Sequence, residues 1–257
     1  MTLAIERKNL ILEKLQENKK VVVSQLSEEF GVSEETIRRD LDKLEQEGFA
    51  IKSYGGAILN ENTNNDIPFL LREKKNFEGK KVIANIIADM IADGEHIIVD
   101  PSSTAVAIIR ALQEKDKKHL SIITNSVEVL LELGDKDDWE IISTGGRLVE
   151  NYLALVGPLT TSSIRSFHAD KVILSCKGID MSRGITDAND QFSHVKELML
   201  HAADTKILAV DATKFDTVAF SQICALSEFD IVVTDNKPSD AWLSYFKERG
   251  ITVKYGN

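Results

Sequence analysis

The sequence contains few of the residues and patterns that mark metal sites, secreted proteins or membrane proteins. Its 257 residues include two cysteines, Cys176 and Cys224, and five histidines, none of them in HxH or HExxH spacing. We therefore expect buried thiols rather than a disulfide, and no metal ion. Walker and GxGxxG loops are missing, so no cofactor is expected. No apolar run approaches the roughly 20 residues of a membrane span, and the N-terminal residues lack the apolar core of a signal peptide, which predicts a cytoplasmic protein.

The sequence also lacks an excess of positive charge. The formal net charge is −10, and residues 1–59 hold nine Lys or Arg against eleven Asp or Glu. This balance argues against nonspecific coating of nucleic acid. Contact with DNA would have to come from a few placed cations, namely Arg38, Arg39, Lys43 and Lys52.

Hydrophobic residues make up 43% of the chain, which is ample for a packed core, and the length allows one large domain or two smaller ones. The first part predicts helices at 4–17, 25–30 and 34–47, a short strand at 21–23 and an extended piece at 49–54 that runs into Gly55-Gly56. Helix, Gly-containing turn, helix and short hairpin is the order of a winged helix-turn-helix domain, which we assign to residues 1–59.

The third helix has one apolar stripe and one polar face. Ser33 is a good N-cap, and the stripe recurs at i, i+4 and i+7, at Ile37, Leu41 and Leu44. Arg39 falls almost opposite the stripe, beside Glu35, Thr36 and Lys43. A helix that offers Thr, two Arg and Lys on its outer face suits a DNA groove. A charged face is more often only solvated, so the helix order before it carries much of this interpretation.

The remainder predicts an α/β domain at residues 76–257, joined by a linker and the start of a connecting helix at 60–75. The connecting helix should run from Pro68 to Gly94. Strands rich in Ile, Val and Leu alternate with helices, which indicates a mostly parallel sheet. The predicted strands are 96–100, 120–124, 139–144, 171–176, 206–211, 230–235 and 251–255, and the helices are 103–113, 126–133, 158–166, 191–203 and 239–248.

Polar residues follow five of these strands. They are Asp100-Pro101-Ser102-Ser103-Thr104, Thr124-Asn125-Ser126, Thr144-Gly145-Gly146-Arg147, Lys177-Gly178 and Asp211-Ala212-Thr213-Lys214. Ligands of open α/β sheets bind outside the carboxyl ends of the strands, and free N–H groups at a helix N-terminus attract anions. Each segment alone is equally readable as a turn or a helix cap. Together, hydroxyls, glycines and three cations predict a site for a small phosphorylated sugar or polyol.

With both parts read, the chain resembles the DeoR family of bacterial transcription regulators over about residues 5 to 255. The strongest match is VSQLSEEFGVSEETIRRDLDKLEQEGFAIKSYGGA, and PFLLREKKN, IADGEHIIVDPSSTA, STGGRL, KGID, GITD and AVDATKF match the family's sensor domain. That sensor domain is related in fold to ribose-5-phosphate isomerase and CoA transferases. The resemblance implies that Ser33–Lys43 is the recognition helix, with Thr36, Arg38 and Arg39 at the DNA and Tyr54, Gly55 and Gly56 in the wing.

The resemblance also implies effector contacts. Asp100 with Ser102, Ser103 and Thr104 matches the family's phosphate loop, and Lys214, beside Asp211, matches the lysine that contacts effector. The family usually has Asp-Ser-Gly-Thr-Thr where this chain has Asp-Pro-Ser-Ser-Thr. The missing glycine makes close backbone approach to a phosphate harder, and Pro101 removes an N–H donor. Three ways to compensate are open: the Ser102 hydroxyl could replace the lost donor, the effector could bind in a different pose, or Lys177 could supply replacement charge.

The resulting prediction is a regulator, most readily a repressor of sugar or polyol genes, that binds operator DNA as a dimer or tetramer and responds to a phosphorylated effector. The alternative is a sugar-phosphate isomerase whose N-terminal part only oligomerises, because Asp211 near Lys214 would suit proton transfer. No second carboxylate stands at a spacing that suggests an acid/base pair.

Overall fold

The computed structural model describes residues 4–46, 48–60, 69–133 and 137–256. The chain divides into two compact units, Met1–Leu71 and Arg72–Asn257. Much of the linker predicted at residues 60–75 falls on residues 61–68, which lie outside the described residues.

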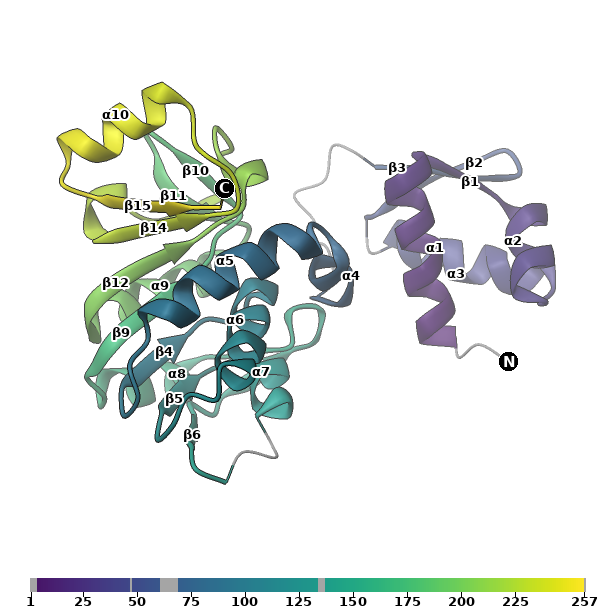
Figure 1. Cartoon of the computed structure of the whole chain (residues 1–257). Helices are drawn as coiled ribbons and strands as arrows, with labels where there is room; N and C mark the ends of the chain where they lie inside the picture. The colour runs from purple at the N-terminus through teal and green to yellow at the C-terminus, as the bar shows by residue number, and fades with distance from the viewer. Residues whose placement is uncertain (1–3, 47, 61–68, 134–136, 257) are drawn as a thin grey trace. The chain divides into compact units, whose positions relative to one another are not determined.

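The first unit is a winged helix-turn-helix, as predicted. Its helices are α1 (Ala4–Asn18), α2 (Val23–Phe30) and α3 (Glu34–Gln46), and its strands are β1 (Lys20–Val22), β2 (Ala50–Ser53) and β3 (Gly56–Leu59). The strands form an antiparallel sheet in the order β1-β3-β2 (Figure 1). β2 and β3 make the hairpin of the wing, and Gly55 at its tip takes a positive φ of 79°.

The turn and packing of this unit follow from its sequence. Gly31 ends α2 in the left-handed conformation at φ 62°, and Ser33 Oγ accepts the Thr36 N–H at 3.2 Å to cap α3. The predicted stripe of α3 is fully buried with α1 and the sheet. Asp40 of α3 is buried too, against Arg7 of α1 at 2.6 Å. Sequence periodicity did not predict this buried ion pair.

The second unit is built on a parallel seven-stranded sheet in the order β15-β14-β12-β9-β4-β5-β6. All seven predicted strands are present. Their bounds are β4 (His96–Val99), β5 (Ser121–Thr124), β6 (Glu140–Ser143), β9 (Ala169–Leu174), β12 (Ala203–Ala209), β14 (Ile231–Thr234) and β15 (Thr252–Tyr255). The central strands are buried on both faces, which explains their near-continuous Ile, Val and Leu.

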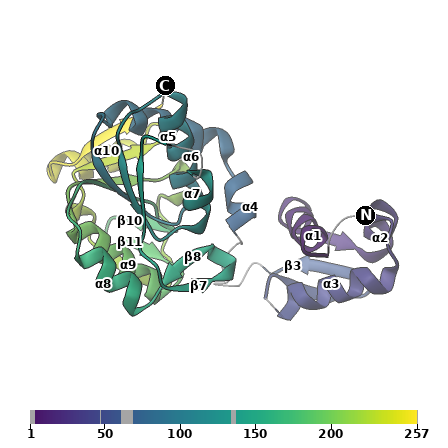
Figure 2. The same ribbon diagram turned by 90° about the horizontal axis from the view of Figure 1, so that it is seen from below.

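Helices cover both faces of this sheet, as Figures 1 and 2 show. On one face lie α5 (Phe77–Met90), α6 (Ser103–Glu114) and α7 (Val127–Glu132); on the other lie α8 (Pro158–Arg165) and α9 (Asp190–His201). The last helix is α10 (Asp240–Glu248). Among the described residues no helix is both long enough and apolar enough to cross a bilayer.

The mostly parallel sheet is confirmed, but the expectation of one continuous connecting helix is wrong. The helix predicted from Pro68 to Gly94 is two helices, α4 (Phe69–Lys74) and α5, separated at Asn76, whose φ is 49°. The Asn76 amide donates to Asp235 Oδ2 at 3.1 Å, a tertiary contact that helical periodicity cannot detect. The sheet prediction also missed two antiparallel additions. They are β7 (Arg147–Val149) with β8 (Ala154–Val156), and β10 (Gly178–Asp180) with β11 (Gly184–Asp187) and β13 (Ser221–Cys224).

Candidate functional site

The strand order defines where a ligand site should lie. β5 and β6 lie on one side of β4, whereas β9, β12, β14 and β15 lie on the other. The order in which strands are added to the sheet therefore reverses between β4 and β9, although all seven strands are parallel. Ligands of open α/β sheets bind at such a switch point, outside the carboxyl ends of the strands. Asp100 follows β4 and Ser175 follows β9. The Ser175 N–H donates to Asp100 Oδ2 at 3.0 Å, which joins the two strand ends.

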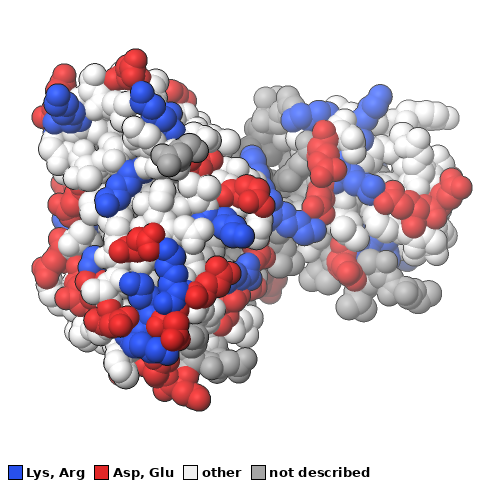
Figure 3. Space-filling model, in the orientation of Figure 1, with Lys and Arg blue, Asp and Glu red and all other residues white. Residues whose placement is uncertain are grey.

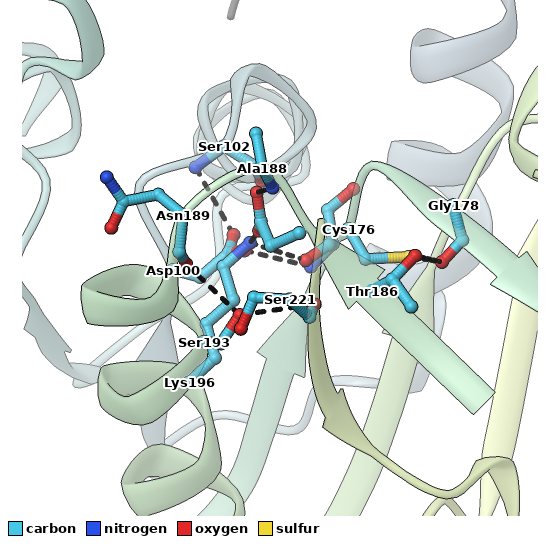
Figure 4. A network of polar contacts seen from close by, with 12 residues as sticks. Asp100, Ser102, Cys176, Gly178, Thr186, Ala188, Asn189, Ser193, Lys196 and Ser221 are labelled. Carbon is cyan, nitrogen blue, oxygen red and sulfur yellow. Dashed lines mark hydrogen bonds and ion pairs between the residues drawn. The ribbon is translucent and has the colours of Figure 1, made fainter. Parts of the chain in front are cut away.

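At this point the ammonium group of Lys196, from α9, lies between two buried carboxylates. Its Nζ is 3.0 Å from Asp100 Oδ2 and 2.6 Å from Asp187 Oδ2, and it donates to the Ser175 carbonyl at 2.7 Å (Figure 4). Burial alone would lower the pKa of Lys196, but the two carboxylates raise it. Burial alone would raise the pKa of Asp187, but the charge and hydrogen bond of Lys196 hold it below its ordinary value. Lys196 and Asp187 therefore hold each other in their charged forms.

Further cations interact with this centre. Burial lowers the pKa of Lys177 to about 7; Asp187 opposes this shift, and the charges of Lys214 and Lys196 add to it. Burial also lowers the pKa of Lys80, on α5, to about 8, and the Lys214 charge again adds to the shift. Buried cations that disfavour one another's charge would gain from a bound anion. A bound anion would therefore raise the pKa values of both lysines.

The loop after β4 places its hydroxyls for structural purposes as well. Ser102 caps α6, because its Oγ accepts the Ala105 N–H at 3.0 Å, and its own N–H donates to Asp100 Oδ1 at 3.3 Å. Ser103 Oγ donates to the carbonyl oxygen of Arg72 at 3.2 Å. Thr104 is buried in the first turn of α6. The loop follows β4 at the carboxyl edge of the sheet, beside the switch point, and its groups already make protein contacts.

The two residues predicted after β5 are also engaged with the protein. Thr124 Oγ1 donates to the Val99 carbonyl at 2.9 Å, which ties β5 to β4. Asn125 Nδ2 donates to the Leu155 carbonyl at 2.8 Å and so holds β8. The buried Oδ1 of Asn125 accepts no hydrogen bond from any residue that the structure describes. This oxygen could accept a hydrogen bond from a ligand.

The predicted Gly145-Gly146-Arg147 segment serves packing. Gly146 has a φ of 125°, and a Cβ there would overlap Thr160 Oγ1 and approach the Val156 carbonyl oxygen to 2.7 Å. Gly146 therefore lets the chain before β7 pass close to β8 and α8. The exposed Arg147 guanidinium contacts Gln191 Oε1 at 3.3 Å, at the start of α9. The structure does not record a contact of Arg147 with the Asp100–Lys196–Asp187 centre.

The segments after β9 and β12 lie at the same edge of the sheet. Gly178 has no room for a side chain, because a Cβ would overlap the Thr217 carbonyl. Asp211 Oδ1 accepts the Thr213 N–H at 3.0 Å and caps the short helix η2 (Ala212–Lys214). Lys214 is half-buried, and its charge acts on both Lys80 and Lys177.

The sequence interpretation missed several residues of this centre, namely Lys196, Asp187, Arg72 and Lys80. A signal for Lys196 was present: it lies on the apolar side of α9, three and four positions before the buried Met199 and Leu200. A lysine in such a stripe is buried only when it is paired. Asp187 ends the GITD segment and carried no comparable signal. The described residues contain no group of three or more His, Cys, Asp or Glu arranged to hold a metal ion.

The candidate DNA-binding surface carries balanced charge. Arg38 pairs with Glu34 at 2.6 Å and the more exposed Arg39 with Glu35 at 3.3 Å, each one helical turn earlier. Lys52, in the wing, pairs with Asp42 of α3. Acidic and basic side chains are interspersed on the visible face of this unit in Figure 3.

The remaining residues predicted at DNA divide into exposed and structural ones. Tyr54 at the wing tip is fully exposed, and Lys43 is exposed on α3. Gly56 is buried, and a Cβ there would overlap the Val21 carbonyl, so this glycine is needed where β3 meets β1. Thr36 Oγ1 lies 2.9 Å from Ser33 Oγ at the start of α3.

The chain has a winged helix-turn-helix unit followed by a parallel α/β unit with charged residues at its switch point. This combination is typical of two-domain transcription regulators. Sequence comparison identifies the family. A model of the DeoR-like helix-turn-helix domain matches residues 7–63, and a model of the DeoR C-terminal sensor domain matches residues 75–236. The chain belongs to the DeoR family of transcriptional regulators.

Similar proteins extend over nearly the whole chain. They include the uncharacterized HTH-type transcriptional regulator YulB of Bacillus subtilis, 36% identical over 98% of this chain and 96% of the relative. GolR of Listeria innocua is 34% identical over 97% of each chain. The transcriptional repressor GlcR of Bacillus subtilis is 32% identical over 96% of this chain and 95% of the relative. Among solved structures, ribose 5-phosphate isomerase A of Methanocaldococcus jannaschii matches with a TM-score of 0.41 and 14% identity over 55% of each chain.

Proposed function

We propose that the chain is a repressor whose operator binding is modulated by a phosphorylated sugar or polyol bound at the switch point between β4 and β9. The observation that carries this proposal is the group of buried or half-buried cations around the strand ends. These are Arg72, Lys80, Lys177, Lys196 and Lys214. Burial lowers the pKa values of three of them, Arg72, Lys80 and Lys177, and a bound dianion would oppose this shift.

The proposed roles follow from position. Lys177, Lys214 and the hydroxyls of the β4–α6 loop face the phosphate, and the free Oδ1 of Asn125 accepts from a sugar hydroxyl. Asp100 is held by Lys196 and orients the loop. Gly145, Gly146 and Arg147 shape the β7–β8 hairpin and make no direct contact with the effector.

On DNA, we propose that α3 enters the major groove with Thr36, Arg38, Arg39 and Lys43, and that the wing tip at Tyr54 follows the backbone. Two such units in a homo-oligomer would read two half-sites, and the protein would act in the cytoplasm, where its operator lies. GlcR, a named repressor among the relatives, supports the sign of regulation.

A thermal-shift screen of phosphorylated sugars and polyols tests the effector site. A true effector raises the Tm of the wild type, and Lys214→Ala removes most of that rise while retaining operator binding. Lys254→Ala, which removes an exposed lysine on β15, serves as the matched control. A Lys214→Ala protein with a wild-type shift would refute the site.

The rival function, isomerisation of a sugar phosphate, would need a carboxylate free to move a proton. Asp211, the candidate base, accepts from Thr213 and caps η2, which favours a regulator over an enzyme. Turnover measured on a panel of aldose and ketose phosphates separates the two functions. Conversion of any of them by the wild type, lost in Asp211→Asn, would establish the enzyme.

A further inference from the structure

α4 is the helix in which the chain passes from one unit to the other. The boundary between the units falls between Leu71 and Arg72. Leu71 is buried with the apolar core of the first unit, whereas Arg72 belongs to the second. A displacement of this short helix therefore reaches both units through the covalent chain.

The C-terminal end of α4 is held by polar groups of the second unit. Lys80 Nζ donates to the carbonyl oxygens of Arg72 and Lys75, and lies 3.4 Å from that of Glu73. Ser103 Oγ donates to the Arg72 carbonyl at 3.2 Å. The last carbonyls of a helix have no partner within the helix and carry partial negative charge, so an ammonium group and a hydroxyl stabilise this end.

The same groups belong to the proposed effector site. Ser103 opens α6 in the loop after Asp100. The charges of Asp211 and Lys214, in and beside the η2 segment, act on the pKa of Lys80. The Arg72 guanidinium lies 5.3 Å from the centre of the Tyr152 ring and interacts with Asp187 and Asp100. The side chains that contact the end of α4 thus belong to the same group of charged and polar residues as the proposed effector site.

We propose that α4 reports the occupancy of the effector site, with Lys80 as the positioning residue that exchanges the carbonyl oxygens of α4 for the anionic group of the effector. This proposal rests on the proposed function. A bound phosphate competes for the Lys80 ammonium and the Ser103 hydroxyl, and Arg72 moves toward the same anion. The carbonyls left without donors then release the end of α4, so occupied and empty sites favour different positions of the chain between the units.

Hydrogen exchange measured on the full chain tests the release directly, with inorganic phosphate at millimolar concentration as the probe. Phosphate should raise the Tm and should speed amide exchange in peptides that cover α4 and the start of α5. Unchanged or slower exchange there, with a raised Tm, would overturn the role of α4 while leaving the effector site standing. If neither phosphate nor any phosphorylated sugar raises the Tm, the proposed function falls, and this proposal falls with it.

Variants separate positioning from folding. In Lys80→Met, the amides of α4 should exchange rapidly even without phosphate. The factor by which phosphate changes operator affinity should be at least tenfold smaller than in the wild type. Lys80→Arg should restore the slow exchange and the effect of phosphate. Lys81→Met removes a neighbouring exposed charge on α5 and is the matched control. If Lys80→Met does not fold, Ser103→Ala gives the same comparison with Ser162→Ala as control, since Ser162 is exposed on α8. Wild-type coupling in the folded Lys80→Met or Ser103→Ala protein would refute the proposal.

Discussion

Replacing Lys196 by methionine tests the centre of the second unit most severely. The change keeps the length of the side chain but removes the positive charge between Asp100 and Asp187, which lie 3.0 Å and 2.6 Å from Nζ. Breaking a buried ion pair by removing one partner costs about 3–5 kcal/mol, because the remaining charge is uncompensated. For a domain of this size, each kcal/mol lowers the Tm by about 2–4 °C. We therefore expect Lys196→Met to melt about 6–20 °C below the wild type.

The pH dependence of this loss gives a second measurement. In the wild type the pKa of Asp187 is lowered, so its contribution to the free energy of unfolding is present at neutral pH and is lost as the pH falls through the lowered pKa. Without Lys196, burial raises the pKa of Asp187, and the carboxyl group takes up a proton in mild acid. The difference in Tm between variant and wild type should therefore narrow as the pH falls from neutral toward about 4.

Differential scanning calorimetry of the wild type, Lys196→Met and Lys196→Met/Asp187→Asn gives the comparison. The double variant removes one of the two stranded charges and should recover part of the lost Tm. A Lys196→Met protein that melts within about 2 °C of the wild type at neutral pH would refute the reasoning. It would show that the ion pairs of Lys196 with Asp100 and Asp187 contribute little to the free energy of unfolding.

Two other predictions concern the two binding surfaces. Arg39→Ala should weaken binding to an operator selected from random DNA by about 10- to 100-fold, the loss expected for one base-reading arginine, and should leave effector binding unchanged. Lys14→Ala, on α1, is the control. Undiminished operator affinity of Arg39→Ala in a gel shift would contradict the role of Arg39. Effector affinity should fall as the pH rises from about 7 to 9, because Lys177 and Lys80, with pKa values of about 7 and 8, lose the protons that a phosphate stabilises. Calorimetric titrations in buffers of different ionisation enthalpy should record proton uptake at pH 8, and Lys177→Met should flatten the profile; an affinity that is constant over this range would refute the role of both lysines.

The parts of the fold that were predictable are those in which local pattern and burial agree. The stripe at Ile37, Leu41 and Leu44 and the seven Ile- and Val-rich strands each carry their own periodic signal. The break at Asn76 was not predictable, because it depends on a hydrogen bond to Asp235 from a distant strand end. The short antiparallel strands escaped notice for a similar reason, since their pairing is defined by the main sheet on which they lie.

The candidate site divides in the same way. Asp100, Lys177 and Lys214 were identifiable because each follows a strand, and parallel strands bring their carboxyl ends to one edge. Lys196 and Arg72 come from helices, and only the packed structure brings them to that edge. Gly146 and Gly178 were expected to allow a ligand's approach, but the space beside them is filled by the protein itself.

The balanced charge of the DNA-binding unit and the charged site of the second unit fit one regulatory scheme. Arg38 and Arg39 are each held by a glutamate one turn earlier, so binding DNA exchanges carboxylates for phosphates and bases and yields little nonspecific affinity. Operator occupancy then depends on a few contacts of about 1–3 kcal/mol each. Coupling between two sites also amounts to about 1–3 kcal/mol. Coupling of this size equals about one base contact, so the exchange of a few hydrogen bonds at the end of α4 is sufficient to change operator affinity by about 5- to 150-fold.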